Sequence, residues 1–205
     1  MDKKIERYFG RNLISKLYVV SIVLIGAAVL IATLYRIYVG LPIALAGIVL
    51  FFVSAVFRVS DKDIDEKVDS ALKNYGEECI KGKHIGKREL SGDEFVYFTG
   101  YLCDKPNVRF KSGSDGKLRT SRFFVTAVSV TRSECIVCAS VYDLLGASPR
   151  EDTFIYLTAE SDNSLTRTEL EFPRGVVKYT AADGQAFCLP DDAQADDLIS
   201  KISRI

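Results

Sequence analysis

Two apolar runs without a charged residue stand next to each other near the N-terminus of the 205-residue chain. The first covers Leu17 to Tyr35 and the second covers Ile37 to Phe57, so only Arg36 separates them. At a rise of about 1.5 Å per residue, such a run spans about 28 Å as a helix, close to the hydrocarbon thickness of a bilayer. The pattern predicts a two-helix transmembrane hairpin within residues 17–58, with spans at about 17–36 and 41–58. Gly40 would end the first helix and Pro42 would begin the second.

The charges that flank the spans predict their orientation. The chain has no net charge, but residues 1–58 hold seven basic and two acidic residues, whereas residues 59–205 hold 20 and 25. Basic residues precede the first span and follow the second, and the turn between the spans carries only Arg36. The positive-inside rule therefore places both termini in the cytoplasm of a multi-pass cell-membrane protein. A cleaved signal peptide fits less well, because the first run is long and a second follows at once.

The two runs contain no Asp, Glu, Lys, Arg or His, which argues against a conduction pathway. The spans do contain small residues, which let two helices approach closely. They predict an anchoring role, with self-association or a protein partner in the membrane. The candidates for helix–helix contact are Gly26, Ala28, Ala32, Gly47 and Ser54.

A basic arm, residues 1–16, precedes the hairpin. Ile5, Tyr8 and Phe9 fall on one side of a helix, which is typical of an interfacial helix; a basic tail that only sets the topology is an equally good interpretation. The candidate contacts with anionic lipid in this arm are Lys3, Lys4, Arg7 and Arg11.

Residues 59–93 indicate a polar juxtamembrane helix and a linker. The helix would run from Ser60 to about Ile80, and its apolar stripe would pack on the following domain or pair with a partner helix. Lys83, Lys87 and Arg88 in the linker are further candidates for anionic-lipid contact, and a solvated linker is the alternative. The stripe consists of Ile64, Val68, Leu72 and Tyr75.

From residue 94 onward the pattern changes to short aromatic and β-branched runs separated by turn residues. Seven such runs predict an antiparallel meander, and an amphipathic helix capped by Asp191 or Asp192 would end the chain. The predicted strands are Glu94–Leu102, Arg122–Thr131, Ile136–Tyr142, Thr153–Thr158, Thr166–Phe172, Val176–Thr180 and Gln185–Leu189.

The chain resembles bacterial membrane proteins that carry a pleckstrin-homology-like (PH-like) domain behind a transmembrane hairpin. The resemblance is carried by Phe123 to Thr126, by the meander that follows, and by Phe187 to Pro190, which lead into the last helix. The resemblance implies an α+β protein in which residues 94–205 form an antiparallel PH-like β-barrel with a C-terminal capping helix. It implies no function by itself.

No motif for catalysis, cofactor or metal stands out. Cys135 and Cys138 have the spacing of a redox or zinc motif, but they lie in a predicted strand, where residues three apart point to opposite faces. The glycines around the only histidine, His84, are too close together for a phosphate loop, and no strand precedes them. We therefore expect no metal, no cofactor and no catalytic residue.

These observations predict a membrane-anchored cytoplasmic binding or scaffold module without catalytic activity. Its partners would be the lipid bilayer and a membrane or cytoplasmic protein, or a second copy of itself. The acidic part of the chain argues against nucleic acid as a partner. Two alternatives stay open: a lipid-sensing regulatory protein that uses the basic residues near the membrane, and a thiol-dependent enzyme.

Overall fold

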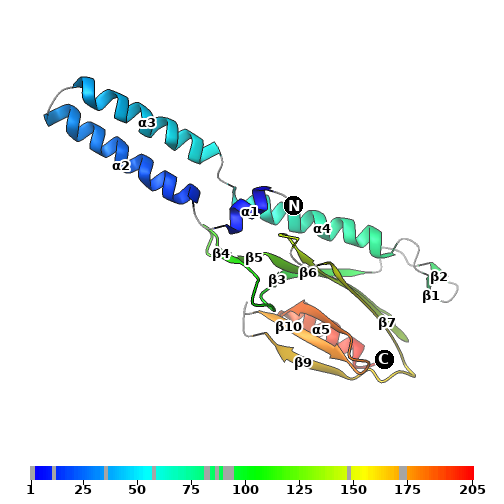
Figure 1. Ribbon diagram of the computed structural model, residues 1–205. Coiled ribbons are helices and arrows are strands. Elements are labelled where there is room, and N and C mark those ends of the chain that lie inside the picture. The colour runs from blue at the N-terminus through cyan, green and yellow to red at the C-terminus, as the bar shows by residue number, and fades with distance from the viewer. Residues whose placement is uncertain are drawn as a thin grey trace. The chain divides into compact units, whose positions relative to one another are not determined.

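The chain forms two compact units in the computed structural model, residues 2–60 and residues 61–205. The structure describes residues 3–10, 13–34, 37–56, 59–80, 84–85, 88–89, 95–146, 149–170 and 175–205. The first unit contains three helices, and the second combines two helices with antiparallel strands, so the protein is of the α+β class (Figure 1). The helices of the first unit are α1 (Lys3–Phe9), α2 (Leu13–Leu34) and α3 (Ile37–Val56).

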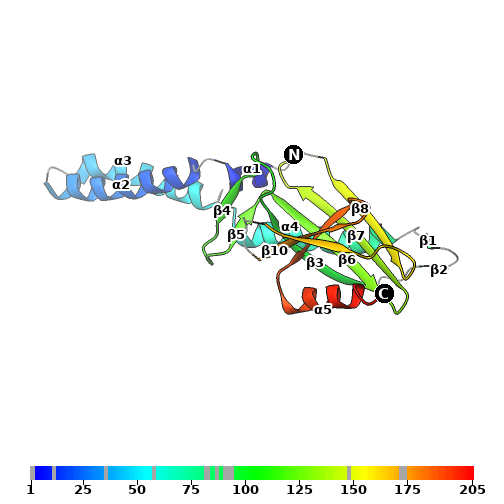
Figure 2. The same cartoon turned by 90° about the horizontal axis from the view of Figure 1, so that it is seen from below.

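The apolar runs form α2 and α3, which lie side by side as an antiparallel hairpin (Figure 1, Figure 2). Both are long and apolar enough to cross a membrane. The expectation that Gly40 ends one helix and Pro42 begins the next is wrong, because α3 starts at Ile37 and contains both residues. Pro42 is the sixth residue of α3, so the helix continues through it with one backbone hydrogen bond missing.

Four strands of the second unit form an antiparallel sheet in the order β3-β6-β7-β8. Thr126 of β6, for example, faces Phe98 of β3 and Ala139 of β7. Almost every residue of β6 is buried, because both faces of the sheet are covered by other elements. The strands are β3 (Val96–Leu102), β6 (Arg122–Val130), β7 (Glu134–Asp143) and β8 (Glu151–Thr158).

One face of this sheet packs on the three-stranded sheet β11-β10-β9 and on the C-terminal helix α5 (Ala193–Ile202). Asp192 caps α5 by accepting a hydrogen bond from the Ala195 N–H at 2.8 Å, which confirms one of the two predicted caps. Ala195, Leu198 and Ile202 are the buried face of the helix. The strands are β9 (Leu165–Glu169), β10 (Val176–Ala181) and β11 (Ala186–Pro190).

Within the described residues, the four-stranded and three-stranded sheets are separate hydrogen-bonded sheets, so they do not close into the expected barrel. The hydroxyl of Thr126 on β6 donates a hydrogen bond of 2.8 Å to the Cys188 carbonyl on β11, so at this point the sheets are joined through a side chain. Apolar side chains of both sheets also pack together in one core cluster. The seven predicted strands are present in the predicted order, with small changes at their described ends; Glu94, Glu171 and Phe172 of the predicted strands lie outside the described residues.

The other face of the four-stranded sheet is covered by α4 (Asp61–Ile80) (Figure 1). Val68 and Tyr75 of its apolar stripe are buried against Phe123, Val125 and other residues of the sheet. The stripe therefore packs within the chain, which is the first of the two predicted alternatives. Because of this packing, α4 belongs to the compact unit 61–205 rather than standing apart as a linker.

Two short hairpins were not predicted. One consists of β4 (Phe110–Ser112) and β5 (Leu118–Thr120) in the connection between β3 and β6. Gly116 in its turn has a φ of +76°, a conformation that favours glycine. The other consists of β1 (His84–Ile85) and β2 (Arg88–Glu89), which place His84 and Arg88 in strands.

Candidate functional site

A group of charged hydrogen bonds lies between α4 and the β4–β5 hairpin. Arg119 of β5 is 2% exposed, and its guanidinium donates to two carboxylates. Its Nε and Nη2 atoms donate to Asp65 of α4 at 2.8 and 2.6 Å, and Nη1 and Nη2 donate to Asp115 at 2.9 Å each. The Tyr101 hydroxyl adds a hydrogen bond of 2.9 Å to Asp65. The planar fork of arginine suits this double pairing.

These contacts keep all three groups charged. Hydrogen bonds from Arg119 are the main reason that the pKa of Asp65 and the pKa of Asp115 lie below the ordinary carboxyl value, although partial desolvation opposes the shift. The same hydrogen bonds raise the pKa of Arg119 further. A general acid or base works best with a pKa near the operating pH. The Arg119 cluster is therefore suited to holding α4 in place and unsuited to proton transfer.

The first residue of α4 is attached to the same hairpin. The Asp61 carboxylate accepts hydrogen bonds from the Ser114 N–H at 2.7 Å and from the Ser114 hydroxyl at 2.8 Å. Asp61 and Asp65 are one helical turn apart, so both face the hairpin. The first two turns of α4 are thus fixed to the β4–β5 hairpin by two independent sets of polar contacts.

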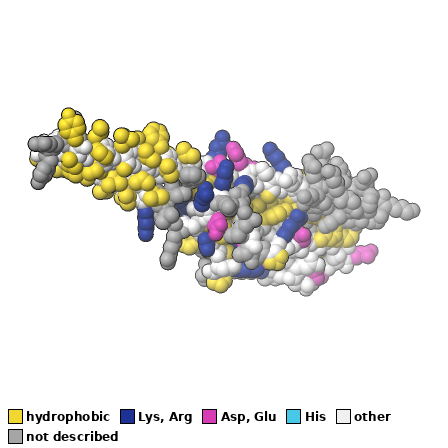
Figure 3. Space-filling view, turned by 45° about the horizontal axis from the view of Figure 1, so that its top comes forward, with side chains coloured by type: hydrophobic (Ala, Val, Ile, Leu, Met, Phe, Trp, Pro, Cys, Tyr) yellow, Lys and Arg dark blue, Asp and Glu magenta, His cyan; other side chains and the backbone are white. Residues whose placement is uncertain are grey.

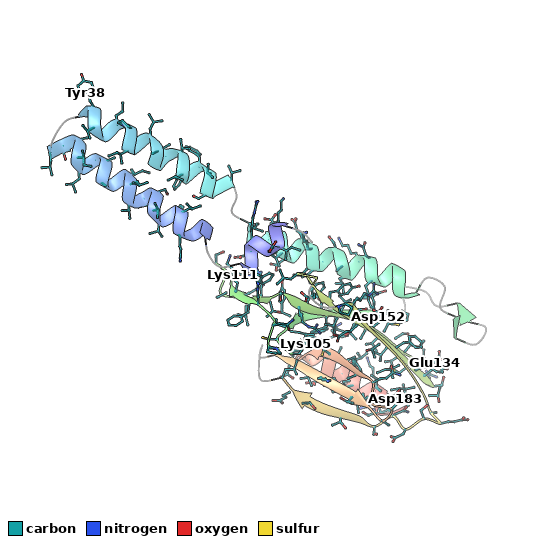
Figure 4. All side chains as sticks on the ribbon, in the orientation of Figure 1. Tyr38, Lys105, Lys111, Glu134, Asp152 and Asp183 are labelled. Atoms are coloured by element: carbon teal, nitrogen blue, oxygen red, sulfur yellow. The ribbon has the colours of Figure 1, made fainter. Side chains whose placement is uncertain are left out.

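Aromatic packing at Tyr75 holds the second half of α4. The ring of Tyr75 meets the ring of Tyr142 edge-on at 6.4 Å, and Tyr142 stacks on Phe123 at 5.1 Å. The guanidinium of Arg150 lies 5.3 Å from the Tyr75 ring and 5.1 Å from the Tyr142 ring, within cation–π range. Asp152 (Figure 4) accepts a hydrogen bond from Arg150 at 2.7 Å. This cluster therefore joins α4, β7 and the start of β8.

A second buried arginine, Arg122, links the residues that follow β3 with the first residue of β8. Its Nη2 atom donates to Asp104 at 3.1 Å and lies 3.4 Å from Glu151. Its Nε atom is 3.0 Å from Asp104 but is not aligned for a hydrogen bond, so this contact is an ion pair only. Lys105 (Figure 4) also donates to Glu151 at 2.6 Å, and this hydrogen bond is the main reason that the Glu151 pKa is lowered.

The cysteines of the C-x-x-C sequence do not form a dithiol. Cys135 lies in the core between the two sheets, and Cys138 lies in the core beneath α4, as predicted for strand residues three apart. Burial raises the pKa of Cys135 to about 12 and the pKa of Cys188 to about 11. Burial also raises the pKa of Cys103. Because the thiolate is the nucleophile and the metal ligand, these thiols are poorly suited to either role.

The candidate lipid contacts lie on separate elements. Lys4 and Arg7 are exposed on α1, whereas Ile5, Tyr8 and Phe9 on the same helix are buried. Arg88 lies in β2, and Lys3 is the first residue of α1. Arg11, Lys83 and Lys87 lie outside the described residues.

Small residues form the contact between α2 and α3. A Cβ atom built on Gly40 would lie 2.7 Å from the Ala28 carbonyl oxygen and from the Ala32 Cβ, and one built on Gly47 would lie 2.8 Å from Ile25. Gly26, by contrast, has no atom within 4 Å of such a Cβ. The buried small residues recur every seven positions, which is typical of a left-handed helix pair. They are Ser21 and Ala28 on α2, and Gly40, Gly47 and Ser54 on α3.

Of the five candidate contact residues, Ala28, Gly47 and Ser54 are therefore buried within the hairpin, and Ala32 lies beside Gly40. Gly26 lies on the outer side of α2, away from the α3 contact. Gly40 and Ser21 also lie at this contact, although neither was among the predicted residues. Their spacing of seven from Gly47 and Ala28 is the signal that identifies them.

Sequence reasoning also missed Arg119 and Arg122, because a basic residue beside a strand is usually solvated. The acidic residues that bind Arg119 and its hairpin gave the useful signal: Asp61 and Asp65 are one turn apart and flank the apolar stripe of α4.

Within the described parts of the chain, no three His, Cys, Asp or Glu side chains are grouped as metal ligands. No protein family, curated protein or solved structure matches this chain.

Proposed function

We propose that this protein is a membrane-anchored binding or scaffold module without catalytic activity. The helices α2 and α3 span the cell membrane, both termini lie in the cytoplasm, and the unit 61–205 binds a partner there. The observation that carries the proposal is the apolar surface of the hairpin. Large side chains such as Val23 and Phe52 are each 63% exposed, and Tyr38 at the start of α3 is 84% exposed (Figure 4).

This apolar surface favours a membrane over the alternatives. The face of the hairpin seen in Figure 3 is covered with hydrophobic side chains. A core helix of a soluble protein would bury such side chains, and soluble proteins rarely expose contiguous apolar patches larger than a few hundred Å². A bilayer of about 30 Å provides the solvent that these helices need.

We further propose that the second unit is a PH-like domain. Its support is the order of its elements: a four-stranded antiparallel meander, a three-stranded antiparallel meander and a C-terminal helix, packed around one core. The β4–β5 hairpin would be an insertion between the first two strands. The helix α4, which covers the outer face of the four-stranded sheet, would be an addition to that plan.

The absence of catalysis is supported by the chemistry of the side chains. The thiols of Cys103, Cys135 and Cys188 have raised pKa values, so little thiolate forms at neutral pH. The carboxylates in the Arg119 cluster are held ionised by hydrogen bonds and are committed to structure. A thiol-dependent enzyme is therefore the least favoured of the three hypotheses.

The protein partner would bind to the second unit. Because the small residues of α2 and α3 are largely used within the hairpin, self-association through them is less favoured. The strands β8 and β9 lie at the edges of their sheets, where an extended segment of another protein adds by backbone hydrogen bonds.

Affinity capture from native membranes in mild detergent tests this proposal. The full chain is compared with a version that ends at Ser60, which keeps the whole first unit. A stoichiometric protein partner that binds only the full chain would support recognition by the second unit. A partner that binds both versions would instead assign recognition to the hairpin. Failure of the full chain to retain any protein would contradict the binding-module proposal.

A further inference from the structure

The strand β9 is an open edge of the second unit. It is the outermost strand in the order β11-β10-β9, and among the described residues it pairs only with β10 (Figure 1). The Leu170 N–H, at the end of this ladder, donates to the Val176 carbonyl of β10 at 3.3 Å. Successive residues of a strand direct their backbone groups to alternate sides, so residues at odd distances from Leu170 direct theirs away from the sheet. They are Leu165, Arg167 and Glu169.

This edge lacks the features that usually prevent an edge strand from pairing with another chain. Natural edge strands are often blocked by proline, by lysine or by a bulge. Residues 165–170 contain neither proline nor lysine, and the ladder from β9 to β10 runs through five consecutive pairs without a bulge. Within the described part of the chain, no other strand is hydrogen-bonded to the outer side of β9. The edge is therefore shaped to accept one more antiparallel strand.

The charges of β9 are complementary to those of a second β9. Arg167 and Glu169 are two positions apart, so both project from the same face of the strand, and both are exposed. In an added antiparallel strand, outward backbone groups must meet outward backbone groups. Placing Arg167 of one copy opposite Glu169 of the other meets this condition and forms two opposite-charge pairs about a twofold axis. The registers on either side would place Arg167 opposite Arg167 or Glu169 opposite Glu169, and like charges in these positions are destabilising.

Arg167 is held in place for such a contact. Its Nη2 atom donates a hydrogen bond to Asp191 at 2.8 Å and lies 3.6 Å from Glu169 of its own chain. A guanidinium carries five N–H donors, so donors remain for the carboxylate of a second copy. Because the bond to Asp191 already restricts the long side chain, binding a further carboxylate costs little additional conformational entropy.

We propose that β9 pairs with β9 of a second copy of this chain, so that two three-stranded sheets join into one continuous sheet. Arg167 of each copy lies opposite Glu169 of the other, and each of these two pairs exchanges two backbone hydrogen bonds. Thr168 lies on the twofold axis, opposite Thr168 of the second copy. The inference rests on the proposed function, because a membrane that holds both copies raises their effective concentration. It names a second copy of the chain as the partner that the second unit binds at β9.

Disulfide cross-linking of the full-length chain in membranes tests this pairing and its register. Thr168 would face Thr168 of the second copy in a non-hydrogen-bonded pair, with Cα atoms about 4.5 Å apart, which suits a disulfide. The matched control is Thr166, which is also exposed but would lie about 13 Å along the strands from Thr166 of the second copy. After oxidation with copper phenanthroline, we expect most of the Thr168→Cys protein to form a disulfide-linked dimer. The Thr166→Cys protein is expected to form no more dimer than the wild type.

Charge reversal in the Thr168→Cys protein supplies the second readout. Arg167→Glu would set Glu against Glu and Glu169→Arg would set Arg against Arg, so each alone is expected to weaken the pairing about tenfold. Co-expression of the two variants with different tags restores both opposite-charge pairs, and the cross-link is then expected to join one variant to the other. The control is Lys201→Glu, which breaks the exposed Lys201–Asp197 pair on α5 and is expected to leave the dimer fraction unchanged.

Maleimide labelling of the reduced proteins shows that each variant is folded, because Cys135 and Cys138 are buried in the folded unit. A folded Thr168→Cys protein that forms no more dimer than the wild type would overturn the pairing through β9. Equal dimer formation by Thr166→Cys and Thr168→Cys would overturn the register. Single charge variants that dimerise as well as their parent would overturn the role of the charge pairs.

The outcomes also separate this inference from the proposed function. Cross-linking of Thr168→Cys to a different protein would assign the edge to that protein, which would overturn self-pairing and leave the second unit as a binding module. Absence of the chain from the membrane fraction would instead contradict the proposed anchor, and with it the shared membrane on which the inference rests.

Discussion

The attachment of α4 through Arg119 gives the most specific prediction for the fold. Replacing Arg119 by methionine keeps most of the side-chain volume and removes four charge-assisted hydrogen bonds to Asp65 and Asp115. Each such bond in a dry site is worth about 1.5–3 kcal/mol. The two carboxylates are about 40% exposed and regain water, so most of that energy is recovered. We expect the free energy of unfolding to fall by about 2–3 kcal/mol.

The measurement is a urea titration of the full chain in detergent, with a maleimide dye as the probe. Cys135 and Cys138 are fully buried, so their labelling reports unfolding of the second unit. With an m-value of about 1–3 kcal/mol/M, the midpoint of Arg119→Met is expected to drop by about 1–2 M. The control is Lys62→Met, which breaks the exposed Lys62–Glu66 pair on the same helix and is expected to change stability by less than about 0.5 kcal/mol.

The pH dependence supplies an independent check with a defined sign. The folded-state pKa of Asp65 lies below its unfolded value, so its contribution is fully present above the ordinary carboxyl pKa of about 4. That contribution is lost as the pH falls through the lower folded-state pKa. The difference between wild type and Arg119→Met should therefore shrink in acid. Equal midpoints for Arg119→Met and Lys62→Met at pH 7 would refute the reasoning.

Three further predictions follow from the packing. Gly40→Leu and Gly47→Leu should each destabilise the α2–α3 hairpin by about 1–3 kcal/mol, measured by thermal unfolding in detergent, whereas Gly26→Leu should not; equal effects would place the helix contact elsewhere. Cys135, with a pKa of about 12, should resist alkylation of the folded protein at pH 8, and labelling at the rate of an exposed thiol would contradict its burial. Tyr75→Ala should cost about 3 kcal/mol in the urea titration, and exposed Lys73→Ala should cost little; equal midpoints would show that Tyr75 does not anchor α4.

The elements that depend on local pattern could be predicted from the sequence. The two apolar runs, the stripe of α4 and the seven strands each show a hydrophobic pattern that is visible within a short stretch of the sequence. The opposite orientation of Cys135 and Cys138 follows from the two-residue period of a strand, and the structure confirms it. The cap of α5 at Asp192 follows from the same kind of local rule.

The elements that depend on distant partners could not be predicted. The β4–β5 hairpin is only three residues per strand, and it is held in place by Asp61 and Asp65 more than 50 positions earlier. The burial of Arg119 depends on the same partners. Pro42 was expected to start a helix because proline is favoured at the first helical position, whereas the structure places it inside α3 with one backbone hydrogen bond missing.

Membrane insertion of a charge-bearing variant tests the central claim most directly. Leu17 to Leu34 contains eleven Leu, Ile and Val residues, which together favour insertion by about 3–6 kcal/mol. Val23→Arg with Leu30→Arg, at two exposed positions of α2, would cost about 6–7 kcal/mol and cancel that preference. Leu34→Arg with Val56→Arg, at exposed helix ends where arginine reaches the headgroups, is the matched control.

The assay is alkaline carbonate extraction of membranes that contain each full-length variant. We predict that the wild-type protein and the Leu34→Arg/Val56→Arg variant stay in the membrane pellet, and that the Val23→Arg/Leu30→Arg variant is lost from it. Extraction of the wild-type protein by carbonate, or retention of the Val23→Arg/Leu30→Arg variant to the same extent as the control, would contradict the account of α2 and α3 as membrane-spanning helices.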